Sequence, residues 1–368
     1  MKNQGRHLAT VIALVLIATV AVYYAVVAMF PIMTVASLEG EMAQPLFTAH
    51  YLVISFLFSL IVVFILYSVV AFRQKEGEDL DGYYTHGNTA LEVAWTFIPV
   101  VVVIVFAVWG SNMLIDMTNE ENDPNAWVVN VTGRKWAWQF EYPEADKTIG
   151  QFVVPVGRPV LLNLESEDII HSFWVPEFHV KQDLLPGTNK QLRFTATMTN
   201  EQIADDMGQA DYQPLVRCAE ICGTSHAYML ANVFSVPDTD AAKQKIDDLS
   251  KLPSDPVDRG AFYYDSLGCI SCHSLDGTLD GYAGPTWQGI YGREEELATG
   301  EVIIVDDLYI ETSIYDPNGQ IVAGYAPAVM PQNFEQQFAD LTASYVAEGF
   351  TDVDMIAELI AFMQTLDE

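Results

Sequence analysis

Three long apolar runs constrain the fold of this chain more than any other feature of its sequence. They span residues 8–30, 50–72 and 94–115 of the 368. Each is about 22 residues long, which is enough for a helix to cross a bilayer core of ~30 Å. Because runs of this length are too apolar to lie in water, the chain is predicted to be anchored in a membrane by transmembrane helices.

Basic residues around the runs predict their orientation. They precede the first run or follow the second, at Lys2, Arg6, Arg73 and Lys75. The loop 31–49 between these two runs contains no Lys or Arg. By the positive-inside rule, the N-terminus and the loop 73–93 face the cytoplasm, and everything after about residue 116 lies on the outer side.

The first run has a second interpretation. Small residues at Thr34–Ser37 offer a site to a signal peptidase, so residues 1–44 form either a retained apolar helix with an outer loop or a cleaved signal peptide. A retained helix is favoured because the run is long for a signal sequence. Residues 45–115 are predicted to form a two-helix transmembrane hairpin.

The acidic residues are unevenly distributed. The chain has 17 Lys and Arg against 49 Asp and Glu, a net charge of −32. A nucleic-acid partner requires a basic surface and is therefore excluded. Residues 253–368 contain two basic residues, Arg259 and Arg293, against 21 acidic ones. This charge is suited to attracting a basic partner, although solubility or adaptation to salt would explain it equally well.

The part of the chain outside the membrane is predicted to contain two domains. Residues 116–237 carry short segments rich in Val, Thr and aromatic residues, which favour a β-sandwich or barrel. The polar segment 238–256 is predicted to be a linker. Residues 257–368 show helical spacing and predict an all-α domain, with helices at 258–268, 305–314 and 352–366.

The second pair of cysteines predicts a bound haem. Cys269-Ile-Ser-Cys272-His273 has the spacing at which two thiols attach a c-type haem and the histidine ligates its iron. Met330, in a loop bounded by Pro327 and Pro331, is the predicted sixth ligand. A His/Met pair of ligands raises the reduction potential and suits electron transfer. A disulfide is the alternative for these cysteines on an oxidising side of the membrane, but it leaves the histidine unexplained.

The first pair of cysteines predicts a copper site. Cys218, Cys222, His226 and Met229 lie within twelve residues and form a soft ligand set that selects copper over hard cations. The same spacing would also place them on one face of an ordinary helix. Gly223 and the β-rich segment that follows favour a loop instead. His171, on an earlier predicted strand, supplies the second imidazole that a two-metal site requires.

These motifs give the sequence a resemblance to a known family. Residues 45–236 are similar to subunit II of the haem–copper oxidases of the cytochrome c oxidase type, and the C-terminal haem motif extends the likeness to bacterial members that carry their own cytochrome c. The resemblance rests on the cysteine loop and on three further stretches: the segment from His86 to Thr96, the segment Trp136-Ala-Trp138-Gln-Phe-Glu-Tyr142, and the segment from His171 to Gly187.

The resemblance implies a fold and a set of site residues. It implies a cupredoxin barrel that holds a dinuclear copper centre, called CuA, followed by a class I cytochrome c domain. The implied copper ligands are His171, Cys218, Cys222, His226, Met229 and, through its backbone carbonyl, Glu220. The carboxylate of Glu220 is implied to bind magnesium at a subunit interface. Trp136 is implied to be the residue at which electrons reach CuA, and Glu92 the entrance of a proton pathway.

The resemblance also implies a function and partners. Electrons would pass from an external donor to the haem, to CuA and then to an oxygen-reducing site in subunit I, with coupled proton translocation. The expected partners are subunits I and III, membrane lipid, and a donor that is a cytochrome c, another small redox protein or a respiratory complex. The expected location is the bacterial inner membrane, with the copper and haem domains in the periplasm. The alternatives are a CuA-containing nitric oxide reductase subunit and a membrane-anchored electron carrier without a catalytic partner.

Overall fold

The computed structural model describes residues 4–30, 34–74, 77, 87–118 and 124–366. The chain divides into two compact units, Met1–Asn122 and Asp123–Glu368. Two of the basic residues that predict the orientation, Lys2 and Lys75, and His86 of the family motif lie outside the described residues.

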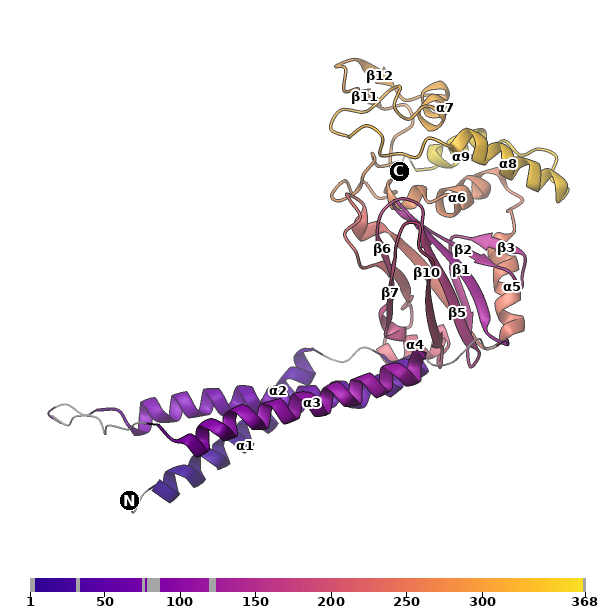
Figure 1. The fold of residues 1–368 in the computed structure, drawn as a ribbon. Helices are drawn as coiled ribbons and strands as arrows, with labels where there is room; N and C mark the ends of the chain where they lie inside the picture. The colour runs from indigo at the N-terminus through magenta and orange to yellow at the C-terminus, as the bar shows by residue number, and fades with distance from the viewer. Residues whose placement is uncertain (1–3, 31–33, 75–76, 78–86, 119–123, 367–368) are drawn as a thin grey trace. The chain divides into compact units, whose positions relative to one another are not determined.

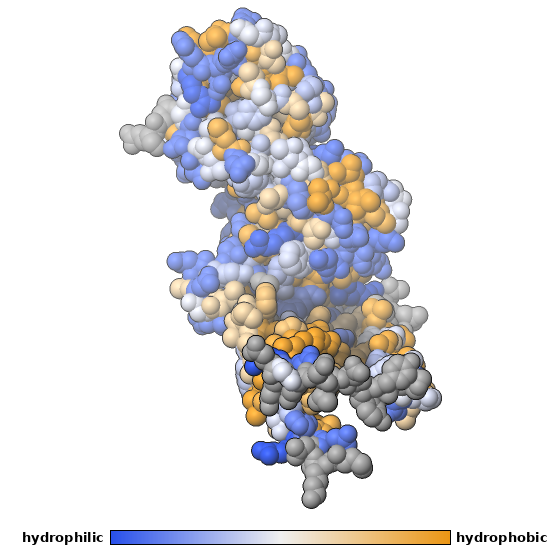
Figure 2. Space-filling model, turned by 90° about the vertical axis from the view of Figure 1, so that its left-hand side faces the viewer, coloured by the Kyte–Doolittle hydropathy of each residue, from blue (hydrophilic) through white to orange (hydrophobic). Residues whose placement is uncertain are grey.

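The first unit contains three long apolar helices, as predicted. They are α1 (Gln4–Met29), α2 (Leu38–Ala71) and α3 (Thr89–Thr118), and the mean hydropathy of their apolar windows is 2.6, 2.8 and 2.5. Most of their large hydrophobic side chains face outward, and some of these apolar surfaces are visible in the lower part of Figure 2. Since outward-facing apolar side chains require a lipid environment, these helices are suited to span a membrane.

Helices α1 and α2 pack together through small side chains. Val15 and Thr19 are buried on α1, and Ser55 and Ser59 are buried on α2. Small residues allow two helix backbones to approach closely where no hydrophobic effect drives helices together in lipid. The N-terminus of α2 is capped by Ser37, whose side chain accepts a hydrogen bond of 3.0 Å from the backbone N–H of Gly40.

The second unit begins with two five-stranded sheets packed face to face (Figure 1). One sheet has the order β3-β2-β1-β5-β8 and the other the order β4-β10-β9-β6-β7. The strands are β1 (Trp127–Arg134), β2 (Ala137–Tyr142), β3 (Lys147–Ile149), β4 (Phe152–Pro155), β5 (Pro159–Ser166), β6 (His171–Val175), β7 (Val180–Leu184), β8 (Lys190–Thr195), β9 (Leu215–Cys218) and β10 (Leu230–Val236). The short helix α4 (Asn200–Met207) precedes β9.

Alternating side chains of these strands form the core between the sheets. Along β1 and β5 every second residue is buried, as expected for strands with one face on a core. The aromatic ring of Phe152 contacts those of Phe140 and Phe173 in this core, and all three are fully buried. Each such side chain contributes roughly 1.5–3 kcal/mol by its removal from water. The predicted all-β domain is therefore confirmed, and its rigid core supports the loops at its end.

The segment 238–256, predicted to be a linker, contains a helix that packs on the barrel. Helix α5 (Thr239–Ser250) buries Ala242 and Ile246 and contacts β3, β4 and β10. Asp238 caps its N-terminus by accepting a hydrogen bond of 2.8 Å from the backbone N–H of Ala241. Most of the connection between the two domains is therefore ordered structure attached to the barrel.

The last part of the chain forms a helical domain around one apolar cluster. Its elements are α6 (Pro256–Ser266), the 3-10 turn Cys269–Ser271, the hairpin β11 (Glu294–Glu296) and β12 (Val302–Ile304), α7 (Asp307–Tyr315), α8 (Phe334–Ala347) and α9 (Met355–Gln364). Helices α6 and α9 pack against each other more extensively than any other pair of helices described in this domain. Their buried side chains form one apolar cluster with Trp287 and Phe334. The three predicted helices are present, whereas α8 and the hairpin were not predicted.

A buried ion pair joins α6 to α9. Arg259 and Glu358 are 3 % and 4 % exposed, and Nε of Arg259 donates to Oε1 of Glu358 over 2.7 Å. Breaking such a pair costs ~3–5 kcal/mol because one charge stays buried alone. Glu358→Gln is therefore expected to lower the free energy of unfolding by about 3 kcal/mol, measured by urea denaturation of the full chain. The exposed control Glu311→Gln should change it by less than ~0.5 kcal/mol. Equal unfolding curves for the two variants would contradict the importance of this pair.

Candidate redox sites

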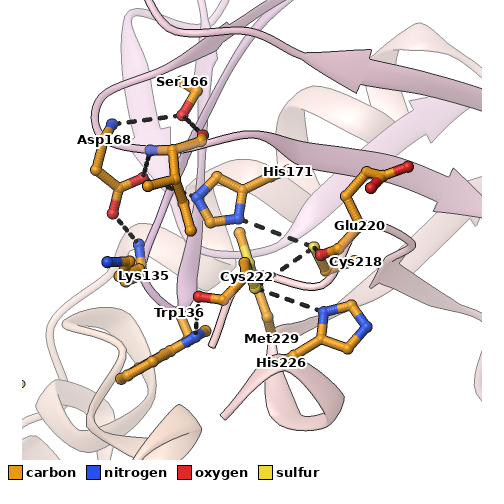
Figure 3. Close-up of polar contacts among 11 residues, drawn as sticks. Lys135, Trp136, Ser166, Asp168, His171, Cys218, Glu220, Cys222, His226 and Met229 are labelled. Carbon is orange, nitrogen blue, oxygen red and sulfur yellow. Dashed lines mark hydrogen bonds and ion pairs between the residues drawn. The ribbon is translucent and has the colours of Figure 1, made fainter. Parts of the chain in front are cut away.

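The copper-ligand candidates come together at one end of the barrel (Figure 3). His171 begins β6, Cys218 ends β9, and these two strands are hydrogen-bonded neighbours in one sheet. The loop after Cys218 contributes Cys222, and a 3-10 turn begins at His226. Met229 ends that turn, just before β10. The antiparallel pairing of three strands therefore brings residues 58 positions apart into one site.

The donor atoms of these residues surround one small space. The Sγ atoms of Cys218 and Cys222 are 3.8 Å apart, well beyond the ~2.05 Å of a disulfide. Cys218 Sγ lies 3.8 Å from Nδ1 of His171 and 3.2 Å from the carbonyl oxygen of Glu220. Cys222 Sγ lies 3.5 Å from Nδ1 of His226 and 3.9 Å from the sulfur of Met229. All six predicted copper-ligand residues thus meet at one place.

These residues fit a copper pair. Metal–nitrogen and metal–sulfur bonds of about 2.0 to 2.3 Å place two ligands of one ion about 3.5 Å apart, close to the separations here. His171, Cys218 and Cys222 are all buried, and soft sulfur with imidazole favours a soft metal such as copper over hard cations. The contact with Cys222 lowers the pKa of Cys218, so that sulfur carries the negative charge that a metal ligand needs.

Asp168 orients the buried His171. Its Oδ1 lies 2.8 Å from Nε2 of His171, and its Oδ2 accepts a hydrogen bond of 2.8 Å from the backbone N–H of Lys135. Burial by itself would raise the pKa of Asp168, but these hydrogen bonds outweigh burial and lower it. The carboxylate therefore accepts the proton of Nε2 and leaves Nδ1 free to face the sulfurs.

Loss of this carboxylate should weaken copper binding. Partners that orient a metal-bound histidine typically contribute 10- to 100-fold to metal affinity. Asp168→Asn is therefore expected to lower copper affinity by roughly 10-fold or more, measured by competition with a copper chelator. The control Asp146→Asn changes an acidic residue in the turn before β3, remote from the site. Unchanged affinity in Asp168→Asn would show that the barrel alone orients His171.

Two tryptophans donate hydrogen bonds to the backbone of the copper loop. Nε1 of Trp136 donates to the carbonyl of Cys222 over 3.0 Å, and Nε1 of Trp138 donates to the carbonyl of Met229 over 3.1 Å. Trp136 also presses against Gly223, whose φ is +120°. A Cβ at that position would lie 2.8 Å from the indole ring, so glycine is required there.

The haem-ligand candidates line a divided cavity in the C-terminal domain. Three adjoining hollows of about 590, 590 and 470 Å³ are each lined by both His273 and Met330. Cys272 lines the first two hollows, and Cys269 lines the first. Trp136 of the barrel also lines the first hollow. This indole therefore touches the copper loop on one side and borders the haem-ligand cavity on the other.

His273 is held with one ring nitrogen free. Nδ1 lies 2.7 Å from the carbonyl oxygen of Pro285, which accepts its proton. Burial lowers the pKa of His273, so the ring is neutral and Nε2 is available as a ligand. Gly284 lies against the ring, and a Cβ there would come within 2.5 Å of Cε1. A cavity with two thiols, an imidazole and a thioether on its walls fits a c-type haem by its donor groups.

The carboxylates of Glu92 and Glu220 lie apart from the sulfur cluster. Glu92, in the first turn of α3, is exposed, and its Oε1 accepts a hydrogen bond of 3.2 Å from the backbone N–H of Asn88. It therefore helps to cap the helix. Glu220 is exposed, and its carboxylate points away from the sulfurs while its carbonyl faces them (Figure 3).

Sequence reasoning missed Asp168 and Trp138 as supports of the copper loop. Asp168 precedes His171 by three residues, a spacing at which an acidic side chain can reach an imidazole. Trp138 stands in the segment Trp136-Ala-Trp138, whose alternation predicts two side chains on one face. Both signals are present in the sequence, but neither distinguishes a support from an ordinary core residue.

Comparison with known proteins adds independent evidence. Residues 146–236 match the family model for the periplasmic domain of cytochrome c oxidase subunit II, and residues 25–112 match that for its transmembrane domain. Residues 257–367 match the cytochrome c family model. These ranges cover the barrel from β3 to β10, helix α2 with most of α3, and the C-terminal helical domain.

Individual proteins similar to this chain are also named as cytochrome c oxidase subunit 2. Cytochrome c oxidase subunit 2 of Alkalihalophilus pseudofirmus is 30 % identical over 326 residues, which cover 84 % of this chain and 90 % of that protein. The Synechocystis protein of the same name is 29 % identical, over 53 % of this chain and 68 % of the relative. A crystal structure of the periplasmic domain of subunit II from Bradyrhizobium japonicum is 26 % identical, with a TM-score of 0.26, and covers 33 % of this chain and 95 % of that one.

Proposed function

The chain belongs to the cytochrome c oxidase subunit II family, and from this premise we propose how its residues perform electron transfer. Its function is to receive electrons for a terminal oxidase, a membrane oxidoreductase. Oxygen reduction occurs in a partner subunit. The observation that carries the proposal is the presence of a copper-ligand cluster and a haem-ligand cavity within one compact unit, with Trp136 bordering both.

The subunit II domain implies copper and the cytochrome c domain implies haem. When bound, these groups supply two one-electron carriers in series. We propose that His171, Cys218, Glu220, Cys222, His226 and Met229 hold the dinuclear CuA centre. Cys269 and Cys272 attach the haem covalently, and His273 and Met330 ligate its iron. The rigid barrel and the hydrogen-bonded loop keep these ligands nearly fixed, which favours fast electron transfer.

We propose that Trp136 is the residue at which electrons reach the copper loop. Its indole is 5 % exposed, donates a hydrogen bond to the backbone of Cys222 and lines a hollow shared with Cys269 and Cys272. In this chain the attached haem domain thus covers the Trp136 side of the copper loop. An external donor then delivers electrons to the haem domain.

We propose that Glu92 lies at the entrance of a proton pathway into subunit I. Its carboxylate is exposed in the first turn of an apolar helix, where solvent can exchange protons with it. Glu92→Gln is expected to slow oxygen consumption by about tenfold or more, as expected when a proton-transferring group is lost. The control Glu41→Gln, in the first turn of α2, should not slow it. Normal turnover in Glu92→Gln would restrict this residue to helix capping.

We further propose that the carboxylate of Glu220 binds magnesium where this chain meets subunit I. The carboxylate is exposed and points away from the copper site, while the backbone of the same residue faces that site. A carboxylate oxygen is a ligand that magnesium prefers. Glu220→Gln should remove the magnesium and leave the copper content unchanged.

The chain is a membrane-anchored protein with partner subunits. We propose that it crosses the bacterial inner membrane several times and places its copper and haem domains in the periplasm. Its partners are subunits I and III, membrane lipid, and an external donor that is a cytochrome c, another small redox protein or a respiratory complex. The acidic cytochrome domain favours a basic donor.

Purification of the complex in mild detergent tests this function. We expect co-purification of a subunit with a-type or b-type haem and a histidine-bound copper, and oxygen consumption driven by a reduced donor. A complex that reduces nitric oxide but not oxygen would indicate a nitric oxide reductase subunit instead. Isolation of the chain without a catalytic partner would indicate a membrane-anchored carrier.

A further inference from the structure

A short segment of the C-terminal domain lies between the two candidate redox sites. This segment, Asp280–Pro285, has the sequence Asp-Gly-Tyr-Ala-Gly-Pro and follows the haem-attachment motif. One part of it contacts the loop that carries the copper ligands, and the other part contacts His273. We call it the bridging segment.

On the copper side, two residues bind the bridging segment. The hydroxyl of Ser225 accepts a hydrogen bond of 2.9 Å from the backbone N–H of Ala283. Tyr228 stacks on Tyr282 with ring centroids 3.8 Å apart, and its hydroxyl donates to the carbonyl of Asp280 over 2.9 Å. Ser225 is fully buried. Since Ser225 and Tyr228 lie on either side of His226 in sequence, the bridging segment is attached at both sides of a copper ligand.

On the haem side, the bridging segment holds the haem-attachment motif. The backbone N–H of Gly284 donates to the carbonyl of Cys272 over 2.9 Å, and the carbonyl of Pro285 accepts from Nδ1 of His273. The bridging segment therefore joins the loop that carries the copper ligands to the haem-attachment motif.

We propose that Ser225 and Tyr228 are positioning residues that fix the copper loop against the bridging segment, and thereby keep His226 and His273 in one relative arrangement for electron transfer. This inference rests on the proposed function. The rate of electron tunnelling falls steeply with the separation of two centres, so a fixed arrangement gives a fast and uniform rate. Without the attachment, the two domains would spend part of their time too far apart.

The test uses the full oxidase complex with Ser225→Ala. A photoactivated ruthenium complex reduces the haem, and the near-infrared absorption of the copper centre reports arrival of the electron. We expect the rate to fall about tenfold, because a buried amide loses this hydrogen-bond acceptor. The copper EPR signal, the copper content and the visible bands of the haem should stay unchanged. Tyr228→Phe keeps the stacking, loses one hydrogen bond and should slow transfer by roughly threefold.

Ser235→Ala is the matched control. Ser235 is also a buried serine, and its hydroxyl donates to the carbonyl of Met198 over 2.7 Å inside the barrel. This variant should lower stability without slowing transfer. An unchanged rate in Ser225→Ala, with both centres intact, would overturn the inference while leaving the proposed function in place. A changed copper EPR signal in Ser225→Ala would also overturn it, since Ser225 would then build the copper site. Absence of haem-to-copper transfer in the unmodified complex would overturn the proposed function itself.

Discussion

Cys218→Ser is expected to abolish the copper centre and oxygen consumption with it. The Sγ of Cys218 lies within 3.8 Å of both Cys222 Sγ and His171 Nδ1, so it contacts ligands on both sides of the site. Serine is a harder ligand and stays protonated at neutral pH, whereas copper selects soft thiolate sulfur. Metal analysis of the purified complex should show a fall from two coppers per chain at this site to a small residual fraction.

Two further measurements make this result specific. The visible spectrum of the haem should remain normal in Cys218→Ser, because Cys269, Cys272 and Met330 are untouched. The control Ser172→Ala changes a buried residue next to His171 in the same strand and should keep both coppers. Retention of the full copper content in Cys218→Ser would contradict the assignment of the site.

Met330→Ala is expected to lower the reduction potential of the haem. Met330 lines the same hollows as His273, and a methionine and histidine pair would raise the potential of a haem iron that it held. Axial ligands set haem potentials over a range of ~0.8 V, so loss of one should shift the potential downward by about 0.1 V or more. A redox titration followed in the visible spectrum measures this shift. Electrons would then leave the haem more readily but enter it from a donor less readily.

Met355→Leu is the matched control for this substitution. Met355 is 3 % exposed at the start of α9 and belongs to the apolar cluster of the domain. A Met-to-Leu exchange keeps the volume of the side chain and typically costs less than ~1.5 kcal/mol of stability. The haem potential should therefore stay unchanged. Unaltered spectra and potential in Met330→Ala would mean that another residue ligates the iron.

Local patterns in the sequence predicted much of this protein. The apolar runs correspond to three helices, because length and hydropathy are properties of a single segment. Cys218, Cys222, His226 and Met229 lie within one loop, so their spacing alone brings them near each other. His171 was assigned through the second imidazole that the site requires and through family resemblance, and strand pairing places it beside Cys218.

The features that were not predicted depend on contacts between distant segments. Helix α5 lies in a polar stretch, and its packing rests on two buried residues, Ala242 and Ile246. The hairpin of β11 and β12 has very short strands, and Glu294–Glu296 has a low intrinsic preference for β-structure. The contact between Ser225 and Ala283 joins residues 58 positions apart in different domains. No local sequence pattern predicts such contacts.

The most direct test of the account is the fate of one electron placed on the haem. In the full complex, photochemical reduction of the haem should be followed by its re-oxidation as the copper centre becomes reduced, with matching time courses. The same experiment in Cys218→Ser should leave the haem reduced. Re-oxidation of the haem at the unmodified rate in Cys218→Ser would contradict the claim that this chain carries electrons from its haem to its copper site.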